Sequence, residues 1–189
     1  MVKNYPGTLI LVVGNSGSGK DSIINGASEK YPLDLKKVYC AKRYITRPPS
    51  ETEDNYYISS EEYNEMRKQG KFALEWQIYG LDYGVPIEID NWLKNGYTVI
   101  VNVSRTIINN TRKKYTNVKV VFIEVPFDIT LLRLKNRERE SEQRMKERIE
   151  RARNNQKYPE ADFVVDNSGE LDDAINQFLN YVISIVKDK

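Results

Sequence analysis

Apolar runs alternate with polar segments along most of this chain. Residues 8–13, 97–103 and 118–125 are almost continuously apolar. Runs of this kind are typical of strands that are buried on both faces of a parallel sheet. Within 129–134 and 171–185 the apolar residues recur at spacings of three and four, which predicts amphipathic helices. Strands that alternate with helices predict an α/β fold, a parallel sheet with helices on both faces.

The other elements are placed by turn and cap residues. Gly70 ends one predicted helix and Asn95-Gly96 ends another, because these residues adopt the conformation that closes a helix. One domain of 189 residues accommodates all of the elements. The pattern predicts further strands at 35–44, 56–58, 72–79 and 161–165, helices at 21–30, from Ser60 to about 69, from Pro86 to about 93 and at 105–114, and loops at 46–55 and 80–84.

The polar stretch 14–22 carries the strongest chemical signal. It reads Gly-Asn-Ser-Gly-Ser-Gly-Lys-Asp-Ser, and it joins a predicted buried strand to a predicted helix. Glycines let the backbone wrap an anion with inward N–H groups, and the helix N-terminus adds a positive field. We interpret the stretch as a phosphate-binding P-loop rather than a plain Gly/Ser turn, with Lys20 reaching the outer phosphates. The expected nucleotide-binding residues are Gly14, Asn15, Ser16, Gly17, Ser18, Gly19, Lys20, Asp21 and Ser22.

The residue after Lys20 departs from the usual P-loop pattern. A Ser or Thr normally stands there and offers a hydroxyl to Mg²⁺, whereas this chain has Asp21, with Ser22 one position later. A carboxylate oxygen is also a suitable Mg²⁺ ligand. We expect Asp21 or Ser22 to hold the metal, and the alternative is that Asp21 only stabilises the first helical turn.

Composition excludes several classes of protein. The chain has 29 basic and 27 acidic residues, and this near balance argues against a general nucleic-acid or membrane surface. The absence of histidine excludes Ser-His and Cys-His hydrolases and most zinc enzymes. The single Cys40 permits no internal disulfide, and its apolar neighbours predict that it is buried. No signal peptide or membrane-length apolar run is visible, so a cytoplasmic location is expected.

Arginines and tyrosines gather where predicted strands end in the middle of the chain. In an open parallel sheet, ligands bind at the carboxyl ends of the strands, where the P-loop also lies. Arg43 and Arg47 lie at the end of the strand at 35–44, and the arginine fork matches phosphate oxygens. Together with a P-loop, these side chains indicate a second, phosphorylated substrate. The other residues of this group are Tyr56, Glu75, Tyr83 and Arg105.

The sequence resembles the guanylate kinase branch of the nucleoside monophosphate kinases. The segments that carry the resemblance are 14–22, 44–49, Tyr83-Gly84 and 137–148, so it runs nearly end to end. It implies one P-loop kinase domain with a substrate-binding insert near 40–90 and an arginine-bearing lid near 135–148. It also implies that Arg47 and Tyr56 grip phosphate and that Arg137 and Arg148 act from the lid. Judged by charge pattern alone, most side chains of 133–153 belong to a solvated helix with Glu/Arg pairs.

Departures from guanylate kinases remove the features that bind guanine. The hydroxyl residue expected after Tyr83-Gly84 is Val85, and the guanine-facing serine corresponds to Arg43. Asn102 and Ser104 replace an acidic pair. A buried purine edge that lacks its polar partners is strongly disfavoured.

With these departures, the sequence resembles a second group, the ribose 1,5-bisphosphate phosphokinases of phosphonate breakdown. The matching segments are Gly17–Ser22, 43–47, 80–85, 88–93 and 101–105. This resemblance implies transfer of the ATP γ-phosphoryl group to the 1-phosphate of ribose 1,5-bisphosphate, with ATP and Mg²⁺ as cofactors. The products are 5-phosphoribosyl 1-diphosphate and ADP. It makes Lys20, Arg137 and Arg148 the catalytic residues and Arg43, Arg47, Tyr56, Glu75, Tyr83, Asn102 and Arg105 the substrate-binding residues.

Several alternatives stay open at this point. Glu75 has equal claims to bind ribose hydroxyls or to be the structural partner of a nearby arginine. The rival functions are a guanylate kinase with a remodelled pocket and an inactive guanylate kinase-like interaction module; a P-loop ATPase or GTPase switch is weaker, since Asn102 stands where an Mg²⁺-binding Asp is usual. A homodimer is left open, and the expected partners are ATP and a phosphorylated small molecule, with neither nucleic acid nor membrane.

Overall fold

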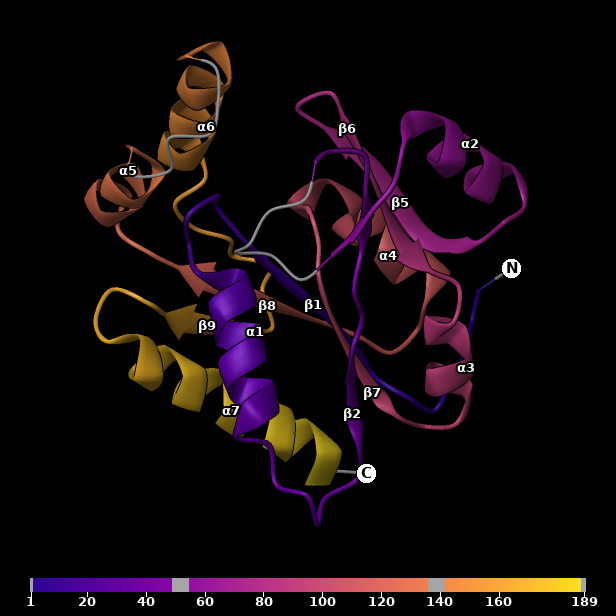
Figure 1. Ribbon diagram of the computed structural model, residues 1–189. Coiled ribbons are helices and arrows are strands. Elements are labelled where there is room, and N and C mark those ends of the chain that lie inside the picture. Colours follow the sequence, from indigo (N-terminus) through magenta and orange to yellow (C-terminus); the bar gives the residue numbers. More distant parts are fainter. Residues whose placement is uncertain (1, 49–54, 136–141, 188–189) are drawn as a thin grey trace. The chain divides into compact units, whose positions relative to one another are not determined.

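A computed structural model describes residues 2–48, 55–135 and 142–187 of the chain (Figure 1). Contacts group the chain into two compact units. The first unit comprises Met1–Leu11 and Leu33–Lys119, and the second comprises Val12–Pro32 and Val120–Lys189. Strand β1 (Leu9–Gly14) crosses from the first unit into the second. Among the described residues, no helix combines the length and apolar character that a membrane crossing demands.

The second unit contains the P-loop and the C-terminal half of the chain. Its strands have the order β1-β8-β9, and β8 pairs with β9 in parallel. Helix α1 packs beside α7, where a Cβ on Gly26 would lie 2.4 Å from Cδ1 of Ile175, so this glycine permits the close approach (Figure 1). The elements are α1 (Lys20–Glu29), β8 (Val118–Glu124), α5 (Phe127–Lys135), α6 (Glu142–Asn154), β9 (Phe163–Asp166) and α7 (Leu171–Lys187).

The first unit adds the other strands of the parallel sheet. Their order is β2-β7-β1, and β2 pairs with β7 in parallel. The N–H of Val99 in β7 donates to the carbonyl of Thr8, just before β1. The elements of this layer are β2 (Val38–Cys40), α3 (Ile89–Lys94), β7 (Thr98–Asn102), the 3-10 helix η1 (Arg105–Ile107) and α4 (Ile108–Lys114).

The first unit also contains a second sheet, of order β4-β3-β6-β5, which the hydrophobic pattern did not predict. Strand β3 pairs in parallel with β4 and antiparallel with β6. The long pair of this sheet is β5 with β6, also antiparallel. Its elements are β3 (Tyr44–Ile45), β4 (Tyr56–Tyr57), β5 (Phe72–Ile78) and β6 (Leu81–Pro86), and helix α2 (Ser60–Lys68) lies between β4 and β5 in the chain.

The predicted turn at 80–84 is wrong beyond Gly80, because Leu81–Pro86 is strand β6. The helix expected from Pro86 is present as α3, but it begins only at Ile89 and ends before Asn95, where the sequence places its end. The turn is only Tyr79-Gly80, with φ of 54° and 72°, the positive values that a type I′ hairpin turn needs. Gly84 and Pro86 disfavour a strand in isolation. Pairing with β5 overrides them: Trp76 lies opposite Tyr83 with stacked rings 5.2 Å apart, and a Cβ on Gly84 would meet the Phe72 ring at 2.5 Å.

Three smaller expectations are also corrected. The strand expected at 35–44 divides into β2 and β3, which belong to different sheets. Helix α2 is capped by Ser59 rather than by Ser60, because Glu62 stands at the position from which it can complete a capping box: the Ser59 N–H donates to Glu62 Oε2, and the Glu62 N–H donates to Ser59 Oγ. Cys40 is exposed rather than buried, since it ends β2 at an edge of its sheet.

Candidate functional site

The loop at 14–19 joins β1 to α1 in the second unit, as the sequence predicts. Gly17 and Gly19 have φ of 80° and 83°, in the left-handed region that favours glycine. Gly19 is the N-cap residue of α1, so the N-cap position has no side chain that could bond the first-turn N–H groups. The first-turn N–H groups and the helix dipole therefore meet at the loop, which is the arrangement that binds phosphate.

Lys20 lies across this loop. Its Nζ donates to the carbonyl oxygens of Gly14 at 3.0 Å and Asn15 at 2.9 Å. The same Nζ lies 3.4 Å from Oγ of the buried Ser18. The ammonium group is thus held at the mouth of the loop, within the reach that a contact to a bound phosphate requires.

Asn167 is a site residue that sequence reasoning missed. It directly follows β9 and is only 1% exposed. Its Nδ2 donates to the carbonyl of Ser18 at 2.8 Å, and its backbone N–H donates to the carbonyl of Glu124 at 2.9 Å. A side chain 149 positions further along the chain therefore holds the P-loop carbonyl next to Gly19. The available signal was a polar residue at the end of a predicted strand, which by itself does not distinguish Asn167 from other loop residues.

Asn167→Ala is expected to lower the free energy of unfolding by about 1–3 kcal/mol, because it leaves a buried carbonyl without its donor. We also expect weaker ADP binding, since the loop loses its support. Chemical denaturation and calorimetric titration with ADP measure the two effects. Asn176→Ala is the matched control, since the Asn176 amide bonds to Asp172 on the exposed face of α7. Equal effects of the two variants would contradict the role of Asn167.

Helix α6 brings Arg148 to the P-loop. Arg148 Nη1 lies 3.4 Å from Oγ of Ser16, a loop residue. Arg148 is therefore placed where it can contact an anion bound in the loop. Arg137 and part of the lid expected near 135–148 fall outside the described residues.

Asp21 and Ser22 lie in the first turn of α1, and only Asp21 is partly buried, whereas Ser22 is exposed. The Asp21 carboxylate, a hard oxygen donor beside the loop, fits the chemistry of Mg²⁺. Among the residues that the structure describes, no cluster of Cys, Asp and Glu gathers as a ready-made metal site. A metal held here would therefore depend on phosphate oxygens for further ligands.

Arg43 is the most unusual of the expected substrate residues, which belong to the first unit. It is a charged residue only 8% exposed. Its Nε donates to Oδ1 of Asn55 at 3.0 Å, and its guanidinium carbon lies 6.0 Å from the centre of the Tyr83 ring. The structure thus brings Arg43 and Tyr83 together. The planar fork of a guanidinium matches the geometry of phosphate oxygens, so Arg43 remains a candidate for binding phosphate.

Arg47 lines an open hollow of about 470 Å³ at the start of α2. Hydroxyl groups surround it there, and Glu62 also contributes to the wall. The backbone N–H and then the hydroxyl of Ser59, which both bond to Glu62, lower the pKa of the Glu62 carboxyl. The lining residues are Thr46, Arg47, Pro48, Tyr57, Ile58, Ser59, Ser60 and Glu62.

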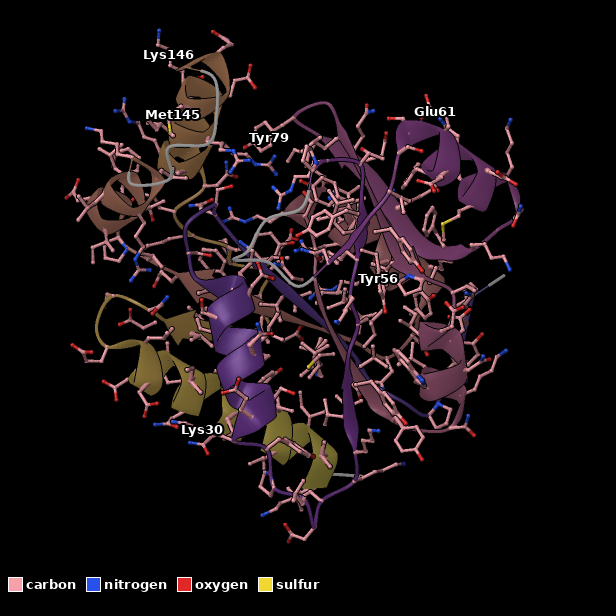
Figure 2. The ribbon with its side chains drawn as sticks, viewed as in Figure 1. Lys30, Tyr56, Glu61, Tyr79, Met145 and Lys146 are labelled. Atoms are coloured by element: carbon pink, nitrogen blue, oxygen red, sulfur yellow. The ribbon has the colours of Figure 1, made fainter. Side chains whose placement is uncertain are left out.

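Tyr44, Tyr56 and Tyr63 belong to β3, β4 and α2 of the first unit. Tyr56 is exposed in β4, and its ring centre lies 4.8 Å from that of Tyr44 (Figure 2). Burial, and after it the neighbours Tyr56 and Glu88, raise the pKa of Tyr44. Burial also raises the pKa of Tyr63 to about 12, and its hydroxyl donates to the carbonyl of Tyr83 at 3.1 Å. The hydroxyls of Tyr44 and Tyr63 therefore stay protonated at physiological pH.

The remaining substrate candidates, Glu75, Asn102 and Arg105, come from β5, β7 and η1. Glu75 is exposed and accepts a hydrogen bond from Nε of Arg67 at 3.1 Å, so the structural partner considered for it is present. Asn102 is buried at the end of β7, and Arg105 begins η1. The last two therefore lie at a strand end, as expected.

A parallel sheet with a glycine-rich loop, a lysine and an uncapped helix start defines the class of P-loop nucleotide-binding α/β proteins. The family model described as guanylate kinase matches residues 6–184. The chain belongs to the guanylate kinase family, within the group of the ribose 1,5-bisphosphate phosphokinases. The resemblance and the fold class expected from the sequence are thereby confirmed.

Two relatives and one solved structure support this assignment. The ribose 1,5-bisphosphate phosphokinase PhnN of Rhodopseudomonas palustris is 39% identical over 147 residues, which cover 78% of this chain and 75% of the relative. The protein of the same name from Pseudomonas paraeruginosa is 36% identical over 180 residues, covering 93% of this chain and 95% of the relative. A crystal structure of guanylate kinase from Anaplasma phagocytophilum has a TM-score of 0.70 at 17% identity, covering 98% of this chain and 89% of that one, which shows the shared fold.

Proposed function

We propose that this chain is a kinase that transfers the γ-phosphoryl group of ATP to the 1-phosphate of ribose 1,5-bisphosphate. The products are 5-phosphoribosyl 1-diphosphate and ADP. The observation that carries the proposal is the buried Arg43 beside Tyr83. A guanidinium there suits a phosphorylated sugar, whereas a guanine edge needs partners of a different kind. The two relatives named above, which carry the name of this activity, support the same substrate.

The proposed reaction needs no general base. The attacking atom is a phosphate oxygen that is already ionised at neutral pH, so a chain without histidine lacks nothing for this step. Catalysis then consists of alignment and charge neutralisation. In this mechanism the loop backbone and Lys20 hold the β- and γ-phosphates of ATP. Asp21, or Ser22 in its place, would hold Mg²⁺, which supplies positive charge to the phosphates when bound.

Arginines hold the acceptor and the transferring group in this mechanism. Arg43, Arg47 and Arg105 bind the two phosphates of the sugar, and Tyr56, Tyr83 and Asn102 add neutral hydrogen bonds. Glu75 has a place here only if it leaves Arg67 for a ribose hydroxyl. Arg148, with Arg137, stabilises the charge of the transferring phosphoryl group and excludes water, which would otherwise compete as acceptor.

A coupled assay of ADP release tests the proposal directly. Ribose 1,5-bisphosphate and GMP are compared as acceptors at matched concentrations with Mg·ATP. We expect turnover with the bisphosphate and little or none with GMP. Strong turnover of GMP would favour a guanylate kinase, and failure to bind Mg·ATP in calorimetry would favour an inactive module.

Arg43→Ser is expected to weaken binding of ribose 1,5-bisphosphate by on the order of a hundredfold, because a charge-assisted contact to phosphate is lost. ATP binding should be unchanged. The KM values for the two substrates measure the effect. Lys68→Ser, which removes an exposed cation from the last turn of α2, is the control. Equal loss of affinity for both substrates would mean that Arg43 has a structural role.

A further inference from the structure

Asn15 forms hydrogen bonds both within the phosphate loop and with the end of α6. Its backbone carbonyl lies in the phosphate loop and accepts a hydrogen bond from Lys20 Nζ at 2.9 Å. Its side chain is directed elsewhere: Nδ2 donates to the carbonyl of Asn155 at 3.0 Å and lies 3.3 Å from the carbonyl of Ala152. Ala152 lies in the last turn of α6 and Asn155 directly follows this helix, and both are more than 130 positions away in sequence. The amide of Asn15 thus ties this helix end to the loop.

The end of α6 needs such donors. The last carbonyls of a helix have no partner within it. Asn155 Nδ2 donates to the carbonyl of Arg151 at 2.7 Å, and Asn15 supplies the donor for the carbonyls of Ala152 and Asn155. Gln156 Nε2 also donates to the carbonyl of Arg153 at 3.0 Å. A donor that belongs to the P-loop therefore adds to the local caps of this helix end.

The contact also sets the direction of Arg148. Arg148 and Ala152 are four residues apart and hence on the same face of α6. Ala152 is buried and its carbonyl faces Asn15, while Arg148 Nη1 reaches Oγ of Ser16, the neighbour of Asn15. Met145 and Ile149 are the other apolar residues of α6, and both are only partly buried. Helix α6 also packs against α5, and the polar contact of Asn15 adds to this attachment.

We propose that Asn15 is a positioning residue: its side-chain amide fixes the end of α6 to the P-loop and thereby places Arg148 at the terminal phosphates. The consequence for catalysis rests on the proposed phosphoryl transfer. The side chain of Asn15 is not required for anion binding, which the loop backbone performs. Its loss should therefore affect kcat much more than the KM for ATP.

The first experiment needs no substrate. Amide hydrogen exchange of residues 145–154 is compared in wild type, Asn15→Ala and Asn154→Ala. Asn154 is an exposed asparagine at the same helix end and is the matched control. We expect exchange in this segment of Asn15→Ala to be about tenfold faster, as expected for the loss of one or two hydrogen bonds, with no change in Asn154→Ala. Unchanged exchange in Asn15→Ala would overturn the proposal.

The second experiment is a double-mutant cycle with Arg148→Ala. We expect Asn15→Ala to lower kcat by about tenfold or more with less than about a threefold change in the KM for ATP. In the Arg148→Ala background the same change should cost less than about twofold, because Asn15 acts through Arg148. Full additivity would overturn the positioning role. If wild type fails to phosphorylate ribose 1,5-bisphosphate, the proposed function is wrong. The exchange experiment still tests whether Asn15 holds the end of α6.

Discussion

Lys20→Ala is expected to lower the turnover of ribose 1,5-bisphosphate by on the order of a thousandfold or more, because the charge opposite the transferring phosphoryl group is lost. Lys20 lies across the loop in the structure, with its ammonium on the carbonyls of Gly14 and Asn15. These contacts keep the side chain at the loop before a nucleotide enters. The affinity for ATP should fall as well, since the β- and γ-phosphates lose their cationic partner. Steady-state kcat and calorimetric binding of ATP measure the two losses.

Lys30→Ala is the control for this prediction. Lys30 is the C-cap residue of the same helix, and its Nζ forms an exposed ion pair with Asp172, far along α1 from the loop (Figure 2). Exposed ion pairs contribute little to stability, so this variant should keep its activity. A Lys20→Ala enzyme with a rate near that of wild type would refute the role of Lys20 in catalysis.

Gly19→Ala is the second change with a large expected effect. At a φ of 83° an alanine is strained by roughly 1 kcal/mol. A Cβ at this position would also lie 2.7 Å from Nδ2 of Asn167, so the amide must move and release the Ser18 carbonyl. Strain and the lost hydrogen bond together amount to about 3 kcal/mol, on the order of a hundredfold in ATP affinity if the loop distorts. Titration with ATP and thermal unfolding measure this loss.

Gly70→Ala separates the effect of backbone strain from that of the lost hydrogen bond. Gly70 has a φ of 68°, almost the same strain for an alanine, but nothing lies within 4 Å of its expected Cβ. This variant should lose about 1 kcal/mol of stability and keep its affinity for ATP. If both variants lose only that much stability and bind ATP normally, the contact between Gly19 and Asn167 is unimportant for the loop.

Local features of the site were predictable because the residues that form them are neighbours in the chain. The P-loop needs a strand, glycines, a lysine and a helix start within a short stretch, and 8–22 supplies them in order. The amphipathic pattern of 171–185 likewise became α7, with Phe178 and Val182 buried. By contrast, β6 was missed, since Gly84 indicates a turn and Pro86 a helix start until β5 lies beside them.

Contacts distant in sequence were not predictable. Asn167 and Asn155 are ordinary polar loop residues in sequence, and only folding places them against Ser18 and Asn15. Glu75 had two readings of equal weight, and the structure pairs it with Arg67 because α2 and β5 put their side chains together. Cys40 was expected inside on the strength of apolar neighbours, but its strand lies at an edge of the sheet.

By itself, the sequence determined the α/β class, the P-loop and the guanylate kinase family, because these depend on residue types at short, fixed spacings. Tertiary structure alone decided which side chains support the loop, where Arg43 is buried, and how α6 is held. Those outcomes depend on donors and acceptors that lie far apart in the chain and meet only when the strands pair and the helices pack, and no local pattern records such a meeting.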